Sequence, residues 1–80
     1  MESLKVYTLQ IGAGVNNAIA TLEHSETLGA ADLIGAVIQA KEIINGKKWR
    51  ADSNFVRLLK ELSGESIVMW VRPMEAVMKV

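Results

Sequence analysis

The densest group of residues that could do chemistry is Lys47-Lys48-Trp49-Arg50. Three cations beside an indole suit contacts with phosphate groups, with the ring stacking on a base or a sugar. A structural role is the alternative. Cations next to the C-terminus of a helix are favourable, and Trp49 can fold back as an apolar lid on the following helix. These four residues are the candidate contact for nucleic acid or another anionic partner.

A second candidate site lies within the last dozen residues, where methionines stand among residue types that are common in interfaces. Methionine adapts its shape to irregular surfaces, and Trp and Arg are enriched in interface hot spots. Alternatively, the segment is a core strand in which Met fills packing gaps, and one strand with two faces can satisfy both interpretations. The candidate partner-binding residues are Met69, Trp70, Arg72, Met74 and Met78.

Residues that would support catalysis, metal binding or cofactor binding are sparse. His24 is the only histidine and cysteine is absent, so a zinc site would need carboxylates for its remaining ligands, which zinc rarely accepts. Gly12-Ala13-Gly14 could open a dinucleotide-binding turn, but Asn17 stands at the third glycine position and no parallel β-α-β unit follows. No serine lies in a strand-to-helix elbow. We therefore expect no enzyme activity, no metal and no cofactor.

The composition describes a small, apolar chain with balanced charge. Half of its 80 residues are hydrophobic, and nine basic side chains offset nine acidic ones, which leaves no overall positive field for nucleic acid. A chain of this length buries only roughly 60% of its unfolded surface, and no disulfide can stabilise it. No segment approaches the ~20 apolar residues of a membrane span. We expect one cytoplasmic domain over residues 1–80, stabilised by packing or oligomerisation.

The first half of the chain predicts a strand followed by an ambiguous segment. Residues 4–11 are rich in β-branched and aromatic types and end at a glycine pair, which predicts a strand. Residues 15–18 could then turn a hairpin whose second strand is 19–24, because Asn tolerates the left-handed backbone of tight turns. The competing interpretation is a short amphipathic helix over 15–22, and we favour the hairpin because the helical stripe is narrow.

The centre of the chain predicts two helices. Apolar side chains cover more than half the circumference of a helix over residues 30–45, so we expect it to be covered on two sides. Asn45-Gly46 predicts its end through a left-handed glycine, and Lys47-Lys48 complements its negative pole. A second helix is predicted from Asp52 or Ser53, either of which can cap it, to Leu62.

The last segment predicts two strands separated by a proline turn. Residues 66–72 are continuously apolar in the middle, the pattern of a strand buried on both faces. Pro73 ends that strand, and residues 76–80 are predicted as a short edge strand.

Together these elements predict an α+β fold with a small antiparallel or mixed sheet of three or four strands and two helices on one face. The predicted order is β-β-α-α-β-β, with β-α-α-α-β-β as the alternative. Such a domain covers one face of its sheet, while residues 67–71 offer apolar groups to both faces. We therefore expect a non-enzymatic interaction module, homodimeric through its C-terminal strands, such as a small regulatory, adaptor or virus-encoded inhibitor protein. The alternative is a small nucleic-acid-binding protein that uses residues 47–50.

Overall fold

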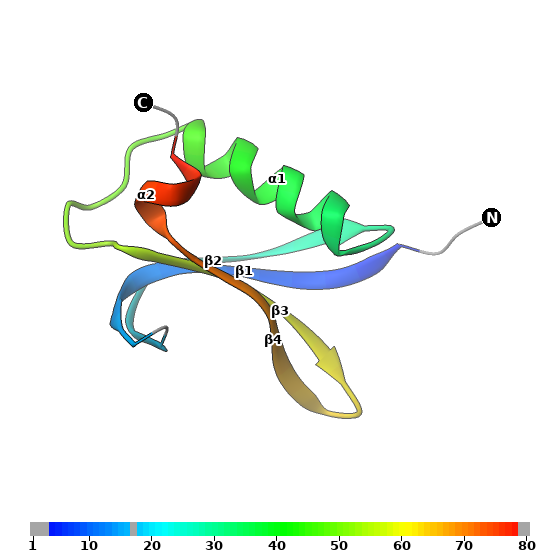
Figure 1. Ribbon diagram of the computed structural model, residues 1–80. Coiled ribbons are helices and arrows are strands. Elements are labelled where there is room, and N and C mark those ends of the chain that lie inside the picture. The colour runs from blue at the N-terminus through cyan, green and yellow to red at the C-terminus, as the bar shows by residue number, and fades with distance from the viewer. Residues whose placement is uncertain (1–3, 17, 79–80) are drawn as a thin grey trace.

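The computed structural model describes residues 4–16 and 18–78. Within them the chain forms an antiparallel sheet with the strand order β2-β1-β3-β4. Both helices lie on one side of the sheet, and the tips of the two hairpins bend away from them (Figure 1). The elements are β1 (Lys5–Val15), β2 (Ala18–Ala30), α1 (Leu33–Asn45), β3 (Phe55–Leu62), β4 (Glu65–Pro73) and α2 (Met74–Val77). The predicted α+β class with a small antiparallel sheet is confirmed.

β1 and β2 form a long hairpin, which confirms the preferred interpretation of residues 15–24. Val15 pairs with Ala18, and the pairing continues to the far ends of both strands. Asn16 has a φ of 54°, the left-handed conformation that Asn adopts more easily than most residues. Asn17, which belongs to the predicted turn, lies outside the described residues.

Two glycines near the tip allow β1 and β2 to approach closely. A Cβ atom on Gly12 would lie 2.0 Å from the carbonyl oxygen of Thr21, and one on Gly14 would lie 1.9 Å from that of Ala18. The register shifts by one residue just before each glycine. Gly12 and Gly14 therefore lie inside β1, where strand pairing requires them, and a strand rather than a helix follows.

α1 packs on the sheet through one narrow face. Asp32 caps the helix, with its Oδ1 accepting a hydrogen bond from the backbone N–H of Gly35 at 2.9 Å. Ala36, Ala40 and Ile44 share the face that is fully buried, and the two alanines let the helix approach the strands. The helix ends at Gly46, whose φ of −91° is right-handed, so the predicted left-handed stop is wrong.

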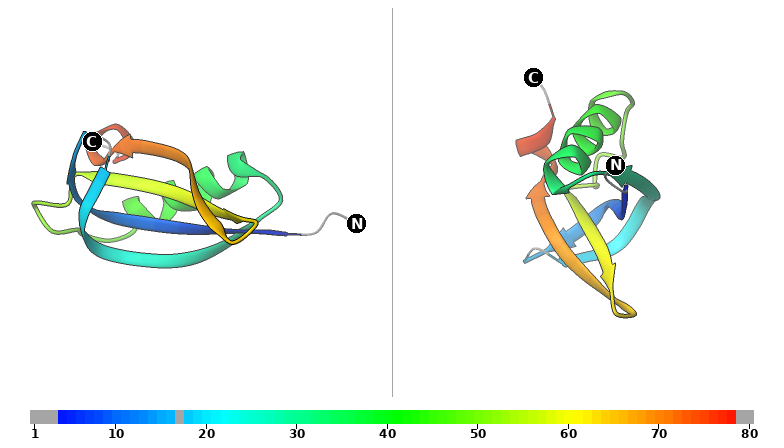
Figure 2. Two further views of the ribbon diagram at one scale, coloured as in Figure 1. Left: turned by 90° about the horizontal axis from the view of Figure 1, so that it is seen from below. Right: turned by 90° about the vertical axis from the view of Figure 1, so that its right-hand side faces the viewer.

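The expectation that α1 would be covered on two sides is also wrong within the described chain. Ile34 and Ile38 point away from the sheet and remain largely exposed. The view along the sheet shows that α1 lies on a single layer of strands, with no other described element packed above it (Figure 2).

The second predicted helix is a strand. Residues 55–62 form β3, which pairs with β1 on one side and with β4 on the other. The apolar positions of this segment fit both periods, and pairing with β1 and β4 satisfies the backbone groups on both edges of β3. Ser63 and Gly64, with φ values of 53° and 82°, form a tight hairpin turn instead of a helix stop.

The last predicted strand is also wrong. After Pro73 the chain forms the single turn α2, and two of its side chains, Met74 and Val77, are buried in the core beside α1. The backbone N–H of Met74 donates to the carbonyl of Asn54 at 2.7 Å, which holds α2 over the start of β3. Lys79 and Val80, the end of the predicted strand, lie outside the described residues. The fold thus has one main helix and one helical turn in place of two helices.

The core lies between the helices and one face of the sheet, and the opposite face has no covering layer in the described chain. No helix among the described residues is long and apolar enough to cross a membrane.

Candidate interaction surface

β4 is one of the two edges of the sheet and the more apolar of them. It pairs with β3, and no other described strand lies beside it. Its sequence is ESIVMWVRP, whereas β2, at the opposite edge, carries Glu23, His24 and Glu26. An edge presents backbone N–H and C=O groups that can pair with a further strand, and charged side chains discourage such pairing. Among the described strands, β4 is therefore the edge better suited to accept another strand.

The first half of β4 exposes apolar side chains on both faces of the sheet. Val68 is 45% exposed and Ile67 is 39% exposed. Val68 pairs with Leu59 on the open face, whereas Ile67 pairs with Lys60 on the face that carries the helices. Because Ile67 remains exposed on the helix side, α1 does not reach this end of β4. The first half of β4 therefore has uncovered apolar side chains on both faces of the sheet.

Met69 is an extra residue in the middle of β4. Trp70 pairs with Leu58 and Val68 pairs with Leu59, so no residue of β3 is opposite Met69. Side chains normally alternate between faces, and the bulge interrupts that alternation. As a result Ile67 and Trp70, three positions apart, both lie on the helix side. The bulge divides the nine residues of β4 into two halves of four.

Trp70 and Arg72 lie on the helix side of the second half of β4. Trp70 is half-buried and packs against the core. The Arg72 guanidinium carbon lies 5.4 Å from the centroid of the indole, a cation–π contact, while the side chain of Arg72 remains exposed. Glu65 lies at the other end of the strand and is also exposed. β4 therefore carries a negative charge at its beginning and a positive charge near its end.

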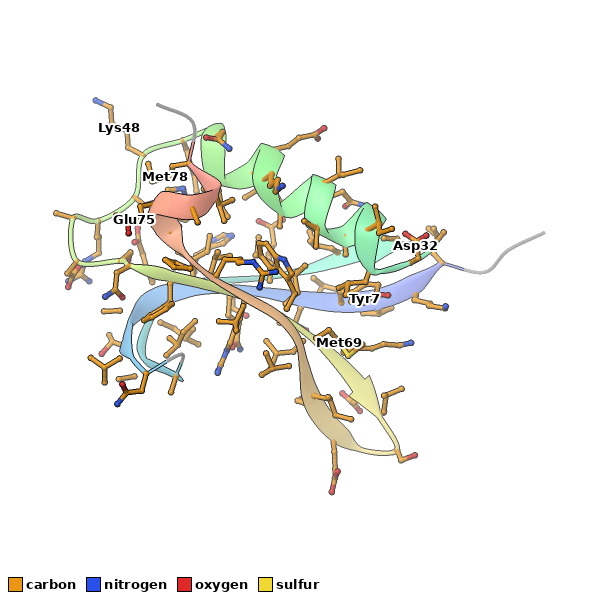
Figure 3. All side chains as sticks on the ribbon, in the orientation of Figure 1. Tyr7, Asp32, Lys48, Met69, Glu75 and Met78 are labelled. Atoms are coloured by element: carbon orange, nitrogen blue, oxygen red, sulfur yellow. The ribbon has the colours of Figure 1, made fainter. Side chains whose placement is uncertain are left out.

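The five predicted partner-binding residues do not form one surface. Met69 and Arg72 are exposed on β4 and Trp70 is half-buried there, but Met74 is in the core. Met78, beyond α2, is exposed and lies far from Met69, near the opposite end of the molecule (Figure 3). The structure therefore keeps β4 as the candidate surface and separates the last two methionines from it.

Trp49, the aromatic residue of the basic cluster, is engaged within the protein. Its Nε1 donates to the carbonyl oxygen of Ile44 at 2.8 Å, and the ring packs against the core. The Nζ of Lys47 lies 4.5 Å from its centroid, and the ring of His24 lies 5.3 Å away. The indole thus closes over the end of α1, and stacking on a nucleic acid base would require it to leave this position.

The cations of the cluster diverge. Lys48 points away from the rest of the molecule (Figure 3). Arg50 forms an ion pair with Asp52, its Nε lying 3.3 Å from Oδ1. The four residues therefore do not converge on one phosphate-sized site.

The side chain of Glu23, on β2, binds the loop that follows α1. Its carboxylate accepts a hydrogen bond from the Ser53 hydroxyl, and its two oxygens lie 3.0 and 3.2 Å from the backbone nitrogen of Arg50. The Ser53 hydrogen bond is the main cause that lowers the pKa of Glu23, and the Arg50 N–H adds to the effect. Ser53 is buried and its hydroxyl is directed to the Glu23 carboxylate, so the pair is not a serine–histidine arrangement.

A cavity of about 480 Å³ separates this loop from α2. The cavity is lined by apolar residues of both candidate sites, one cation and one anion. The lining residues include Trp49, Arg50, Phe55, Met74, Glu75 and Met78. The cavity is large enough for a partner side chain or a small molecule.

No metal site is formed in the described part of the chain, where no three His, Asp or Glu side chains cluster. His24 instead makes a hydrogen bond through Nε2 to Oε1 of Glu26 at 2.7 Å.

Sequence reasoning missed the contact of Glu23 with Ser53, since 30 residues separate them. It included Ile67 and Val68 among the apolar residues of the C-terminal strand, yet could not place that strand at the edge.

Comparison with protein-family models, with curated proteins and with solved structures gives no match.

Proposed function

We propose that this chain is a non-enzymatic protein interaction module that binds another polypeptide strand along β4. The observation that carries the proposal is the edge of β4 with which no described strand pairs, together with the apolar side chains exposed on both faces of its first half. A strand added there would complete a row of backbone hydrogen bonds and cover Ile67 and Val68 at the same time. Backbone pairing supplies affinity in this mode of recognition, and the side chains supply specificity.

The composition and size of the chain support the same proposal. A domain this short has little room to bury all of its apolar residues, and β4 is where several of them remain exposed. Small regulatory, adaptor and inhibitor proteins act through surfaces of this kind, without a catalytic centre.

Site-specific photo-crosslinking tests the proposal. A photoreactive amino acid replaces Val68, and in a matched variant it replaces Val6, which is 62% exposed on the open face of β1. We expect illumination to give polypeptide adducts from position 68, both with the purified protein at high concentration and in extract of the cells that produce it. Equal adduct yields from the two positions, or none from position 68, would contradict the proposal.

A further inference from the structure

We infer that the strand that pairs with β4 is β4 of a second copy of this chain, aligned antiparallel across a twofold axis near Val68 and Met69. This inference rests on the proposed function. It identifies the partner and the register, which the exposed edge alone does not give.

The charges of β4 are self-complementary in the antiparallel orientation. Glu65 lies at the beginning of the strand and Arg72 near its end, with uncharged residues from 66 to 71 between them. Antiparallel alignment of two copies places each glutamate beside the arginine of the other copy. Parallel alignment would instead place like charges side by side, which is unfavourable.

The bulge at Met69 makes the register that pairs Glu65 with Arg72 compatible with the faces of the two strands. Residues opposite each other in a sheet share a face, and a twofold axis perpendicular to the sheet keeps the helix side of both copies on the same side. Glu65, Ile67, Trp70 and Arg72 all lie on the helix side, because they pair with Leu62, Lys60, Leu58 and Val56 of β3. The faces match when Glu65 is opposite Arg72 and Ile67 is opposite Trp70 of the second copy.

The same register leaves both bulges at the axis. Ser66 is then opposite Val71 on the open face. At the centre, Val68 of each copy is opposite Met69 of the other copy. Residues 65–67 of each copy are opposite residues 70–72 of the other copy, so each bulge lies at the axis, between the two sets of paired residues. If all residues of β4 alternated as in a regular strand, Glu65 and Arg72, seven positions apart, would lie on opposite faces and this pair could not form across the twofold axis.

In this arrangement the exposed residues of β4 become partners of one another. Ile67 gains contact with the indole of the second copy, and the two four-stranded sheets become one continuous sheet with all helices on the same side. Each dimer contains two symmetric contacts between Glu65 and Arg72, because the axis repeats every pair.

Charge reversal tests the register directly. Glu65→Arg places two arginines at each contact, and Arg72→Glu places two glutamates there. We expect each variant alone to dimerise roughly tenfold more weakly than the unaltered chain, by sedimentation over a concentration series at low salt. An equimolar mixture of the two variants restores opposite charges at both contacts, so we expect it to recover the affinity as a heterodimer.

Three further variants provide the controls. The double variant Glu65→Arg with Arg72→Glu recovers the homodimer, which shows that neither substitution prevents folding. Val68→Lys weakens the dimer, whereas Val6→Lys on the same face leaves it unchanged. Circular dichroism checks that each variant is folded.

The outcomes separate this inference from the proposed function. If the mixture associates no more tightly than the single variants, or if the unaltered chain stays monomeric up to about 1 mM, the inference is overturned. Adducts from position 68 with a different polypeptide would then still support β4 as the binding strand. If neither Val68→Lys nor the charge reversals change a measurable dimer, β4 is not the interface and both proposals fail.

Discussion

At the scale of single residues, Gly12 and Gly14 decide whether the long hairpin can close. Their Cβ positions would fall 2.0 and 1.9 Å from carbonyl oxygens of β2, and a backbone carbonyl cannot turn aside as a side chain can. We expect Gly12→Ala and Gly14→Ala each to lower the free energy of unfolding by about 1–3 kcal/mol, measured by urea denaturation.

Gly29 is the matched control, since it lies in β2 where a Cβ atom would meet only Leu4 Cδ1 at 3.5 Å. We expect Gly29→Ala to change the free energy of unfolding by about 0.5 kcal/mol or less. Equal losses at all three glycines would show that strand propensity, and not the close approach, explains the effect.

Glu23 should make the stability of the protein depend on acid pH. Its pKa is lowered in the folded state by the Ser53 hydroxyl, so the native protein favours the charged carboxylate. The stabilisation is complete above the ordinary pKa of 4.5 and is lost as the pH falls through the lowered folded value. We expect Glu23→Gln to destabilise the protein at pH 7 and to reduce the loss of stability between pH 5 and about 3.

The measurement is the urea midpoint of both proteins across that pH range. Glu42→Gln serves as the control, because the side chain of Glu42 is exposed on α1 and its carboxylate accepts no hydrogen bond from the described residues. Parallel pH profiles of the Glu23 variant and the unaltered protein would mean that the contact with Ser53 does not contribute to stability.

The contact of Glu23 with Ser53 also shows a limit of sequence reasoning at this scale. The sequence makes Ser53 one of two candidates, with Asp52, for capping a helix, a local role that its position before an apolar segment indicates. Its actual partner is on β2, and no spacing along the chain points to a carboxylate so far away.

At the scale of elements, β3 can be distinguished from the helix that its apolar pattern predicts. A helix would place Leu58 and Leu62 on one face, four residues apart. In the strand the two residues also share a face, but Leu58 lies in the core and is fully buried, whereas Leu62 lies at the end of β3 and is 42% exposed. We expect Leu58→Ala to cost about 2–5 kcal/mol and Leu62→Ala about 1 kcal/mol or less, by urea denaturation. Equal losses would support the helix.

The difference between α1 and β3 explains what could be predicted. α1 has a capping Asp32, a long apolar stripe and a glycine at its end, so its local signals agree. In β3, Phe55, Val56, Leu58, Leu59 and Leu62 satisfy both the helical and the strand spacing. The choice is made by β1 and β4, which need a strand between them, and these neighbours are distant in sequence.

At the scale of the whole molecule, the candidate surface depends on the strand order. The apolar character of residues 67–71 was evident from the sequence, but the position of β4 at an edge follows from β3 pairing with β1. The same strand order places β2, which carries Glu23, His24 and Glu26, at the other edge of the sheet. The strand with two apolar sides could therefore be predicted, whereas its free edge could not.

The whole molecule also has a consequence for nucleic acid binding. Its net charge is zero, and its most prominent basic cluster is divided between a packed Trp49, an ion-paired Arg50 and the outward-pointing Lys48. We expect single-stranded DNA and RNA oligonucleotides to leave the tryptophan emission unchanged at both low and moderate salt. A shift that disappears as salt is added would favour the alternative function.

The bulge of β4 also allows this strand to lose one residue without turning over. Deletion of Met69 would return the strand to uninterrupted alternation, because Val68 on the open face would be followed directly by Trp70 on the helix side. Regular pairing of all nine residues would instead turn one half over, and if the second half turned, the indole of Trp70 would leave the interior and Val71 would take its place. A homologue that kept every neighbouring residue but lacked this methionine would therefore keep the same side chains in the core.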